Sequence, residues 1–126
     1  MHEFSLAQSL LQTAIEVATQ NQALQITKIN LKFGTFALVM EDQFRFCMDI
    51  LKEEDELTKE MEVIIKWEEG VIQCVECGYN GITDSSKEND YGMISSLKCP
   101  KCQSYDTRVV KGMETFIEDI SIKSDD

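Results

Sequence analysis

Apolar residues recur at helical spacing in two segments of the chain, and each segment predicts an amphipathic helix. The first helix is expected over residues 4–20, where Ser5 and Gln8 have the spacing of a capping box, so the helix begins near Ser5 or somewhat earlier. A second helix is expected over residues 42–53. The apolar stripe of the first helix comprises Phe4, Ala7, Leu11, Ala14, Ile15 and Ala18, and that of the second comprises Phe44, Cys47, Met48 and Leu51.

Three segments alternate with a period of two residues and predict strands. Residues 26–33 place Ile29, Leu31 and Phe33 on one face and polar residues on the other, as in a half-buried strand. Residues 61–67 alternate less cleanly, because Ile64 falls on the polar face, so both faces are expected to be partly covered. A third strand runs from Thr115 towards Ile122 with one extra residue at 118–119, which a β-bulge would produce, and residues 124–126 are expected to form a tail.

The order of these elements predicts an α+β fold in which two helices pack on one face of a three-stranded sheet. The cysteine-containing segment, residues 70–111, interrupts this domain between its second and third strands. We therefore expect one domain from residues 1–69 plus 112–126, and an inserted zinc-ribbon-like domain from residues 70–111.

Composition narrows the class of protein. The chain has 126 residues, which fits one domain with a small appendage, and its net charge is −11. Such a surface repels phosphate backbones, so we expect no nucleic-acid partner. The N-terminal segment does not resemble a signal peptide, and no apolar run approaches the length of a membrane span, so a cytoplasmic location is expected.

The strongest chemical signal is a pair of C-x-x-C motifs, Cys74 with Cys77 and Cys99 with Cys102. In a reducing compartment such pairs are typical of metal sites, and four thiolates suit tetrahedral structural zinc. Rubredoxin-like iron and a redox dithiol pair remain alternatives. The spacer of 21 residues between the motifs is slightly long, and we expect the excess in a polar surface loop over residues 83–92. The fifth cysteine, Cys47, is interpreted as a buried small apolar residue.

The only histidine, His2, indicates a second metal site. The α-amine of Met1, the backbone nitrogens of His2 and Glu3, and the His2 imidazole can close small chelate rings around one ion, and planar nitrogen donors suit Ni(II) or Cu(II). The ordinary alternative is a solvated histidine on a frayed terminus. Glu41 and Asp42 either add an oxygen ligand or simply begin the second helix, where acidic residues suit the helix dipole.

Catalytic motifs are not evident. With a single histidine there is no obvious base for a Ser-His-Asp arrangement, and no phosphate-binding loop is present, so we do not expect an enzyme.

Besides the two cysteine pairs, the chain contains four short motifs in a fixed order: Met1-His2-Glu3-Phe4-Ser5-Leu6-Ala7, Lys32-Phe33-Gly34, Phe44-Arg45-Phe46 and Val109-Val110-Lys111-Gly112. In this order they resemble the motifs of the HypA/HybF family of hydrogenase maturation nickel metallochaperones. The resemblance covers essentially the whole chain. It departs from the family pattern in the long spacer and at Gln103, where glycine is frequent.

This resemblance implies a nickel-binding α+β domain with an inserted zinc domain. It implies Ni(II) at His2, with the Met1 amine and the backbone nitrogens of His2 and Glu3 contributing, and zinc on the four paired cysteines. It further implies a partner GTPase of the HypB type and delivery of nickel to the [NiFe]-hydrogenase large subunit, or in some organisms to urease. We expect a monomer or weak homodimer. The alternative function is a zinc-ribbon protein-interaction module without nickel transfer.

Overall fold

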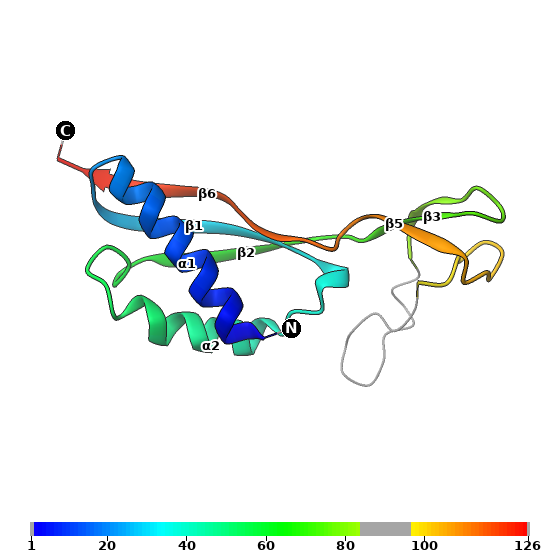
Figure 1. Ribbon diagram of the computed structural model, residues 1–126, viewed down its shortest axis with the longest axis horizontal. Coiled ribbons are helices and arrows are strands. Elements are labelled where there is room, and N and C mark those ends of the chain that lie inside the picture. Colours follow the sequence, from blue (N-terminus) through cyan, green and yellow to red (C-terminus); the bar gives the residue numbers. More distant parts are fainter. Residues whose placement is uncertain (1, 84–96, 126) are drawn as a thin grey trace. The chain divides into compact units, whose positions relative to one another are not determined.

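The computed structural model describes residues 2–83 and 97–125 and contains two compact units (Figure 1). The first unit comprises residues 1–32, 39–66 and 116–126, and the second comprises residues 33–38 and 67–115. Whether residues 70–111 fold as an independent domain stays a prediction. The elements in chain order are α1 (Glu3–Gln20), β1 (Ala23–Gly34), the 3-10 turn η1 (Thr35–Ala37), α2 (Glu41–Lys52), β2 (Glu62–Glu68), β3 (Val71–Cys74), β4 (Asn80–Ile82), β5 (Thr107–Lys111) and β6 (Thr115–Ser124).

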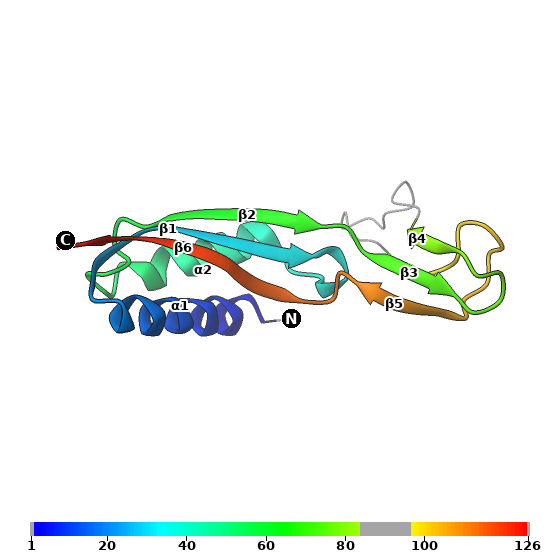
Figure 2. The same ribbon diagram turned by 90° about the horizontal axis from the view of Figure 1, so that it is seen from above.

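The first unit is a two-layer α+β arrangement. Its sheet has the strand order β2-β1-β6, and α1 packs against α2 on one side of this sheet (Figure 1). Figure 2 shows β1 and β2 running in the same direction and β6 in the opposite one. The predicted fold class, two helices on a three-stranded sheet, is therefore confirmed. Among the described residues, no helix combines the length and apolar character that a membrane crossing needs.

The core of the first unit lies between the helices and the sheet. Most of the predicted apolar stripe of α1 is buried, but Phe4 is 48% exposed in the first turn. Leu10, which the predicted stripe omits, is buried because it lies one turn before Ala14 on the same helix face. Within the first unit, the buried residues of the helices and β1 are Ala7, Leu10, Leu11, Ala14, Ala18, Ile26, Ile29, Leu31, Phe44, Met48 and Leu51.

Two details of the helices bear on the sequence-based expectations. Helix α1 begins at Glu3, with His2 as its N-cap, so of the two expected starts the one earlier than Ser5 is observed. The acidic Glu3 in the first turn favours this earlier start through the helix dipole. Cys47 is half-buried rather than buried, because it lies beside the fully buried Met48 at the edge of the packed face.

The strands follow their predicted patterns closely. In β1, Ile29, Leu31 and Phe33 are buried while the alternate positions are more exposed. In β2, residues 63–65 are all half-buried, as expected for a strand with both faces partly covered. Strand β6 extends to Ser124, so the first residue of the predicted tail still belongs to the strand, whereas Asp125 lies outside it. The predicted bulge near residue 118 stays a prediction.

The second unit contains a small antiparallel sheet with the strand order β4-β3-β5. The pairing of β3 with β5 is irregular between Val71 and Ile72. Gly34 and Gly112 bring two chain segments into contact, because a Cβ on Gly34 would lie 2.1 Å from the carbonyl oxygen of Gly112. The N–H of Phe36 donates to that same oxygen (2.8 Å). Only a glycine at position 34 allows this approach.

Candidate metal centres

The four paired cysteines form one cluster in the second unit. Their sulfurs all lie within 4.8 Å of one another, with separations that include Cys74 Sγ to Cys102 Sγ (3.5 Å) and Cys77 Sγ to Cys99 Sγ (3.6 Å). A tetrahedral zinc site with Zn–S bonds of about 2.3 Å places its sulfurs about 3.8 Å apart. The cluster therefore fits a zinc site, whereas a disulfide needs sulfurs about 2.05 Å apart.

The first pair lies on a tight turn that follows β3. The N–H of Gly78 donates to the carbonyl of Cys74 (3.1 Å), and the N–H of Cys74 donates to the carbonyl of Tyr79 (2.8 Å). The N–H of Cys77 points at the Cys74 sulfur (3.5 Å). Gly78 has φ +79°, a left-handed conformation that glycine adopts without steric cost. Its place directly after the pair is therefore required by the turn.

The second pair repeats this turn with a different residue at the left-handed position. The N–H of Gln103 donates to the carbonyl of Cys99 (2.9 Å), and the N–H of Cys99 donates to the carbonyl of Ser104 (2.8 Å). Gln103 has φ +72°. The position at which this chain departs from the family pattern is thus the one where a side chain strains the backbone.

The sulfurs differ in their electrostatic surroundings. Burial raises the pKa of the Cys99 thiol, but the N–H groups of Cys102 and Lys101 point at its sulfur and lower that pKa to about 7. At Cys102 the N–H of Ser104 lowers the pKa, whereas burial and the neighbouring thiols raise it to about 12. One sulfur of the cluster therefore ionises readily and opposes ionisation of its neighbours. A divalent cation in the centre would remove that repulsion, which is the chemistry of a thiolate metal site.

The second candidate site is the beginning of α1. His2 is exposed, and its side chain makes no capping hydrogen bond, so the imidazole is available to a ligand. The first backbone hydrogen bond of the helix runs from Leu6 N–H to His2 O (3.0 Å). The Glu3 carboxylate accepts a hydrogen bond from the N–H of Met40, the N-cap of α2 (3.0 Å), which ties the two helix starts together (Figure 1). Met1 lies outside the described residues.

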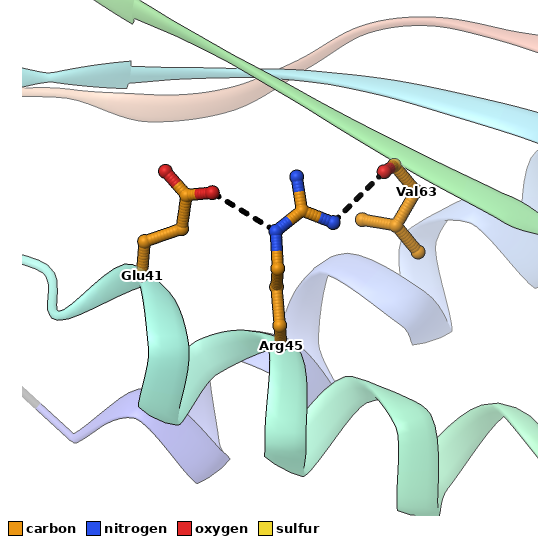
Figure 3. Close-up of polar contacts among 3 residues, drawn as sticks. All are labelled: Glu41, Arg45 and Val63. Carbon is orange, nitrogen blue, oxygen red and sulfur yellow. Dashed lines mark hydrogen bonds and ion pairs between the residues drawn. The ribbon is translucent and has the colours of Figure 1, made fainter.

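Glu41 and Asp42 form the first turn of α2, as the helix-start interpretation expects. The Glu41 carboxylate accepts a hydrogen bond from Arg45 Nε (2.9 Å), and Arg45 Nη1 donates to the carbonyl oxygen of Val63 on β2 (3.0 Å; Figure 3). This role of Arg45 in joining helix to strand was not predicted. The i, i+4 spacing of Glu41 and Arg45 is a sequence signal that could have predicted the ion pair, whereas no sequence signal points to the strand partner of Arg45.

Comparison with known proteins decides the family. Residues 1–122 match the model of the family described as "Hydrogenase/urease nickel incorporation, metallochaperone, hypA". The chain belongs to the HypA family. The resemblance noted from the sequence is thereby confirmed, and HypA proteins are metallochaperones and maturation factors, not enzymes.

Individual HypA relatives match over nearly their whole length. The hydrogenase maturation factor HypA of Dehalococcoides mccartyi strain 195 is 35% identical, and the match covers 97% of this chain and 94% of the relative. The HypA of Methanopyrus kandleri is 31% identical over 98% of this chain and 94% of the relative. The solution structure of the Ni metallochaperone HypA from Helicobacter pylori has a TM-score of 0.68 at 24% identity and covers 99% of this chain and all of that one. The structural likeness supports the fold.

Proposed function

We propose that this HypA-family chain binds Ni(II) at its N-terminus and delivers it during [NiFe]-hydrogenase maturation. The proposed nickel donors are the α-amine of Met1, the backbone nitrogens of His2 and Glu3, and the His2 imidazole. The observation that carries this assignment is the position of the helix start, directly after His2. The nickel is cargo, so the site has to release it as well as hold it.

The helix start supplies amide nitrogens that take no part in the hydrogen-bond ladder of α1. The first N–H groups of a helix have no intrahelical acceptor, and the ladder of α1 starts with the bond from Leu6 to His2. Deprotonating the amides of His2 and Glu3 therefore breaks no helical hydrogen bond. Two amidate nitrogens also balance the charge of Ni²⁺, so the positive end of the helix dipole does not oppose binding.

The Glu3 side chain has a positioning role in this proposal. Its carboxylate is engaged by the N–H of Met40, and this contact holds the first turn of α1 beside the first turn of α2. A fixed helix start pre-orders part of the chelate, whereas a frayed terminus would lose more conformational freedom on binding. The backbone nitrogen of Glu3, rather than its carboxylate, is the proposed nickel ligand.

Zinc is the proposed resident metal on Cys74, Cys77, Cys99 and Cys102, where the sulfur separations suit a closed tetrahedral site. Four protein ligands leave no open position, so the proposed role is structural. Ile72 is the one fully buried aliphatic residue that the described strands of the small sheet supply. A metal that crosslinks both turns would supply the stability that this small core lacks.

Delivery requires partners. The proposed ones are a maturation GTPase of the HypB type and the hydrogenase large subunit, with transfer taking place in the cytoplasm. An exposed terminal chelate supports such a role, because an incoming ligand can reach the ion without unfolding the protein. Urease is the second client class that the family description names.

The test is a calorimetric Ni(II) titration of tag-free, zinc-loaded protein beside His2→Ala and a variant with one residue added before Met1. We expect one site in the parent protein and its loss in both variants, with zinc content and melting unchanged. Cys74→Ala is the reciprocal control and should lose zinc while retaining the N-terminal nickel site.

Equal nickel binding by parent and His2→Ala would contradict the N-terminal site. That result would favour the alternative function, a zinc-ribbon interaction module without nickel transfer. If the extended variant kept nickel binding while His2→Ala lost it, only the role of the Met1 amine would be rejected.

A further inference from the structure

Helix α2 has two apolar faces, and only one of them is packed. Phe44, Met48 and Leu51 are buried towards the rest of the first unit. On the other side, Phe46 is 62% exposed and Ile50 is 51% exposed. These two residues are four apart, so their side chains are neighbours along one ridge of the helix. An aromatic and an aliphatic residue together at the centre of an exposed helix face need an explanation.

The orientation of α2 is held by side chains that reach the adjoining strand. Arg45 Nη1 donates to Val63 O (3.0 Å; Figure 3), and Lys52 Nζ donates to Met61 O (2.9 Å). These contacts lie seven residues apart along α2, and together they resist rotation of the helix about its axis. Phe46 and Ile50 therefore remain on the outer face and cannot turn into the core.

The outer face of α2 also carries exposed acidic side chains, and the segment that follows the helix is acidic as well. Residues 41–62 contain nine Asp or Glu and three Lys or Arg, a net charge of −6 out of −11 for the chain. Two of those three cations, Arg45 and Lys52, donate to backbone carbonyls of β2 and of the residue directly before it. Asp42, Asp49 and Glu53 are exposed on the helix turns that flank the apolar pair. The apolar pair Phe46 and Ile50 is therefore flanked by three carboxylates, those of Asp42, Asp49 and Glu53, which we call the acidic frame.

We propose that this outer face of α2, formed by Asp42, Phe46, Asp49, Ile50 and Glu53, docks a cationic amphipathic helix of a partner protein. Apolar residues of that helix would cover Phe46 and Ile50, since ridges spaced at i and i+4 on one helix fit grooves on another. Its flanking Lys or Arg side chains would pair with the acidic frame. The docking face is independent of nickel, and it stands whether or not the N-terminal chelate binds the ion.

Charge argues against a second copy of the chain as the occupant. Two copies of this face brought together would oppose Asp42, Asp49 and Glu53 with the same three acids, and like charges at an interface cost several kcal/mol. Homodimerisation through this face is therefore an outcome that would overturn the proposal. Sedimentation or light scattering of the free protein distinguishes a monomer, whose face is open to a partner, from a homodimer.

The experiment uses the full-length, zinc-loaded protein labelled with ¹⁵N and a synthetic helix as probe. The probe is an 18-residue peptide with Leu on one face and Lys beside it. Its matched control has Glu in place of every Lys. We expect the Lys peptide to shift amide signals of residues 42–53 selectively, and to bind more weakly at 300 mM than at 50 mM salt. The Glu peptide should not bind.

Two variants and one control locate the face. Phe46→Ser and Asp49→Lys should each weaken peptide binding, Phe46→Ser by about tenfold or more. Val17→Ser, which removes an exposed apolar residue from α1, should leave binding unchanged. Both test residues are exposed, so the variants should fold, and unchanged amide spectra outside α2 would establish this.

The proposal is overturned if the Lys peptide shifts residues elsewhere, if Phe46→Ser and Val17→Ser bind alike, or if the Glu peptide binds equally well. Loss of nickel binding in His2→Ala would not affect these results, so the two proposals fail separately.

Discussion

Replacing Gln103 with glycine should tighten zinc binding, although it removes a side chain. Gln103 has φ +72°, close to the φ of +79° at Gly78 in the matching turn of the first cysteine pair. An L-residue in this left-handed region costs about 1–2 kcal/mol. Both turns use the same backbone hydrogen bond to the first cysteine of their pair. The second turn therefore carries strain that the first one avoids.

The expected magnitude follows from two opposing terms. Gln103→Gly removes the strain of about 1–2 kcal/mol, but glycine costs roughly 0.5–1 kcal/mol more to order on folding. The net stabilisation is about 0.5–1 kcal/mol. Because metal binding and folding of such a site are coupled, zinc affinity should rise about two- to fivefold. Gly78→Ala should lower it by a similar factor, and nothing lies within 4 Å of the added Cβ, so the effect would come from φ alone.

The assay is competition for zinc against a chromophoric chelator at fixed pH, with the melting temperature of each loaded variant as a second readout. Gln103→Ala is the matched control, because it removes the side chain and keeps the strain, and its affinity should stay within about twofold of the parent. If Gln103→Gly and Gln103→Ala changed affinity equally, the side chain rather than the backbone would be responsible. Weaker zinc binding by Gln103→Gly would refute the strain argument outright.

Three further measurements test other parts of the molecule. Gly34→Ala should destabilise the loaded protein by about 1–3 kcal/mol in thermal melting, because its Cβ would lie 2.1 Å from the Gly112 oxygen; an unchanged melting temperature would contradict that close approach. Arg45→Met should cost about 1 kcal/mol through the lost bond to Val63, whereas Glu41→Gln, which weakens the part-exposed ion pair and leaves the Val63 contact in place, should cost less; equal losses would argue against the strand contact. Zinc affinity should fall as pH falls, because protons compete with zinc for the thiolates, and a flat profile between pH 6 and 8 would exclude thiolate ligands.

The sequence predicted the first unit well because its signals are periodic and local. The alternation of Ile29, Leu31 and Phe33 and the stripe around Met48 each depend on one buried face, so burial follows directly from the pattern. The start of α1 was harder to place. Ser5 has capping spacing, but the contact of Glu3 with Met40, 37 residues away, lies at the observed start.

The second unit was predicted through its cysteines rather than its strands. Strands of three to five residues, such as β4 and β5, are too short to establish a period, and the polar row Gln73, Asn80 and Arg108 conceals the sheet. The C-x-x-C pairs were recognisable because the donors of each turn are close in sequence. Their convergence into one cluster depends on pairing of β3 with β5, which no local pattern encodes.

The same distinction explains why Arg45 and Lys52 were missed. Both read as ordinary surface cations on an acidic helix, and their sequence positions give no sign of the strand carbonyls that they reach. Only the fold reveals that these charges turn inward, and only then does the outer face become almost entirely acidic around Phe46. A charge count along the sequence includes Arg45 and Lys52 as neutralising charges, whereas in the folded chain both cationic groups are bonded to the backbone carbonyls of Val63 and Met61. The electrostatic character of α2 is therefore a property of its packing, and a partner would meet a more negative surface than the composition of the segment implies.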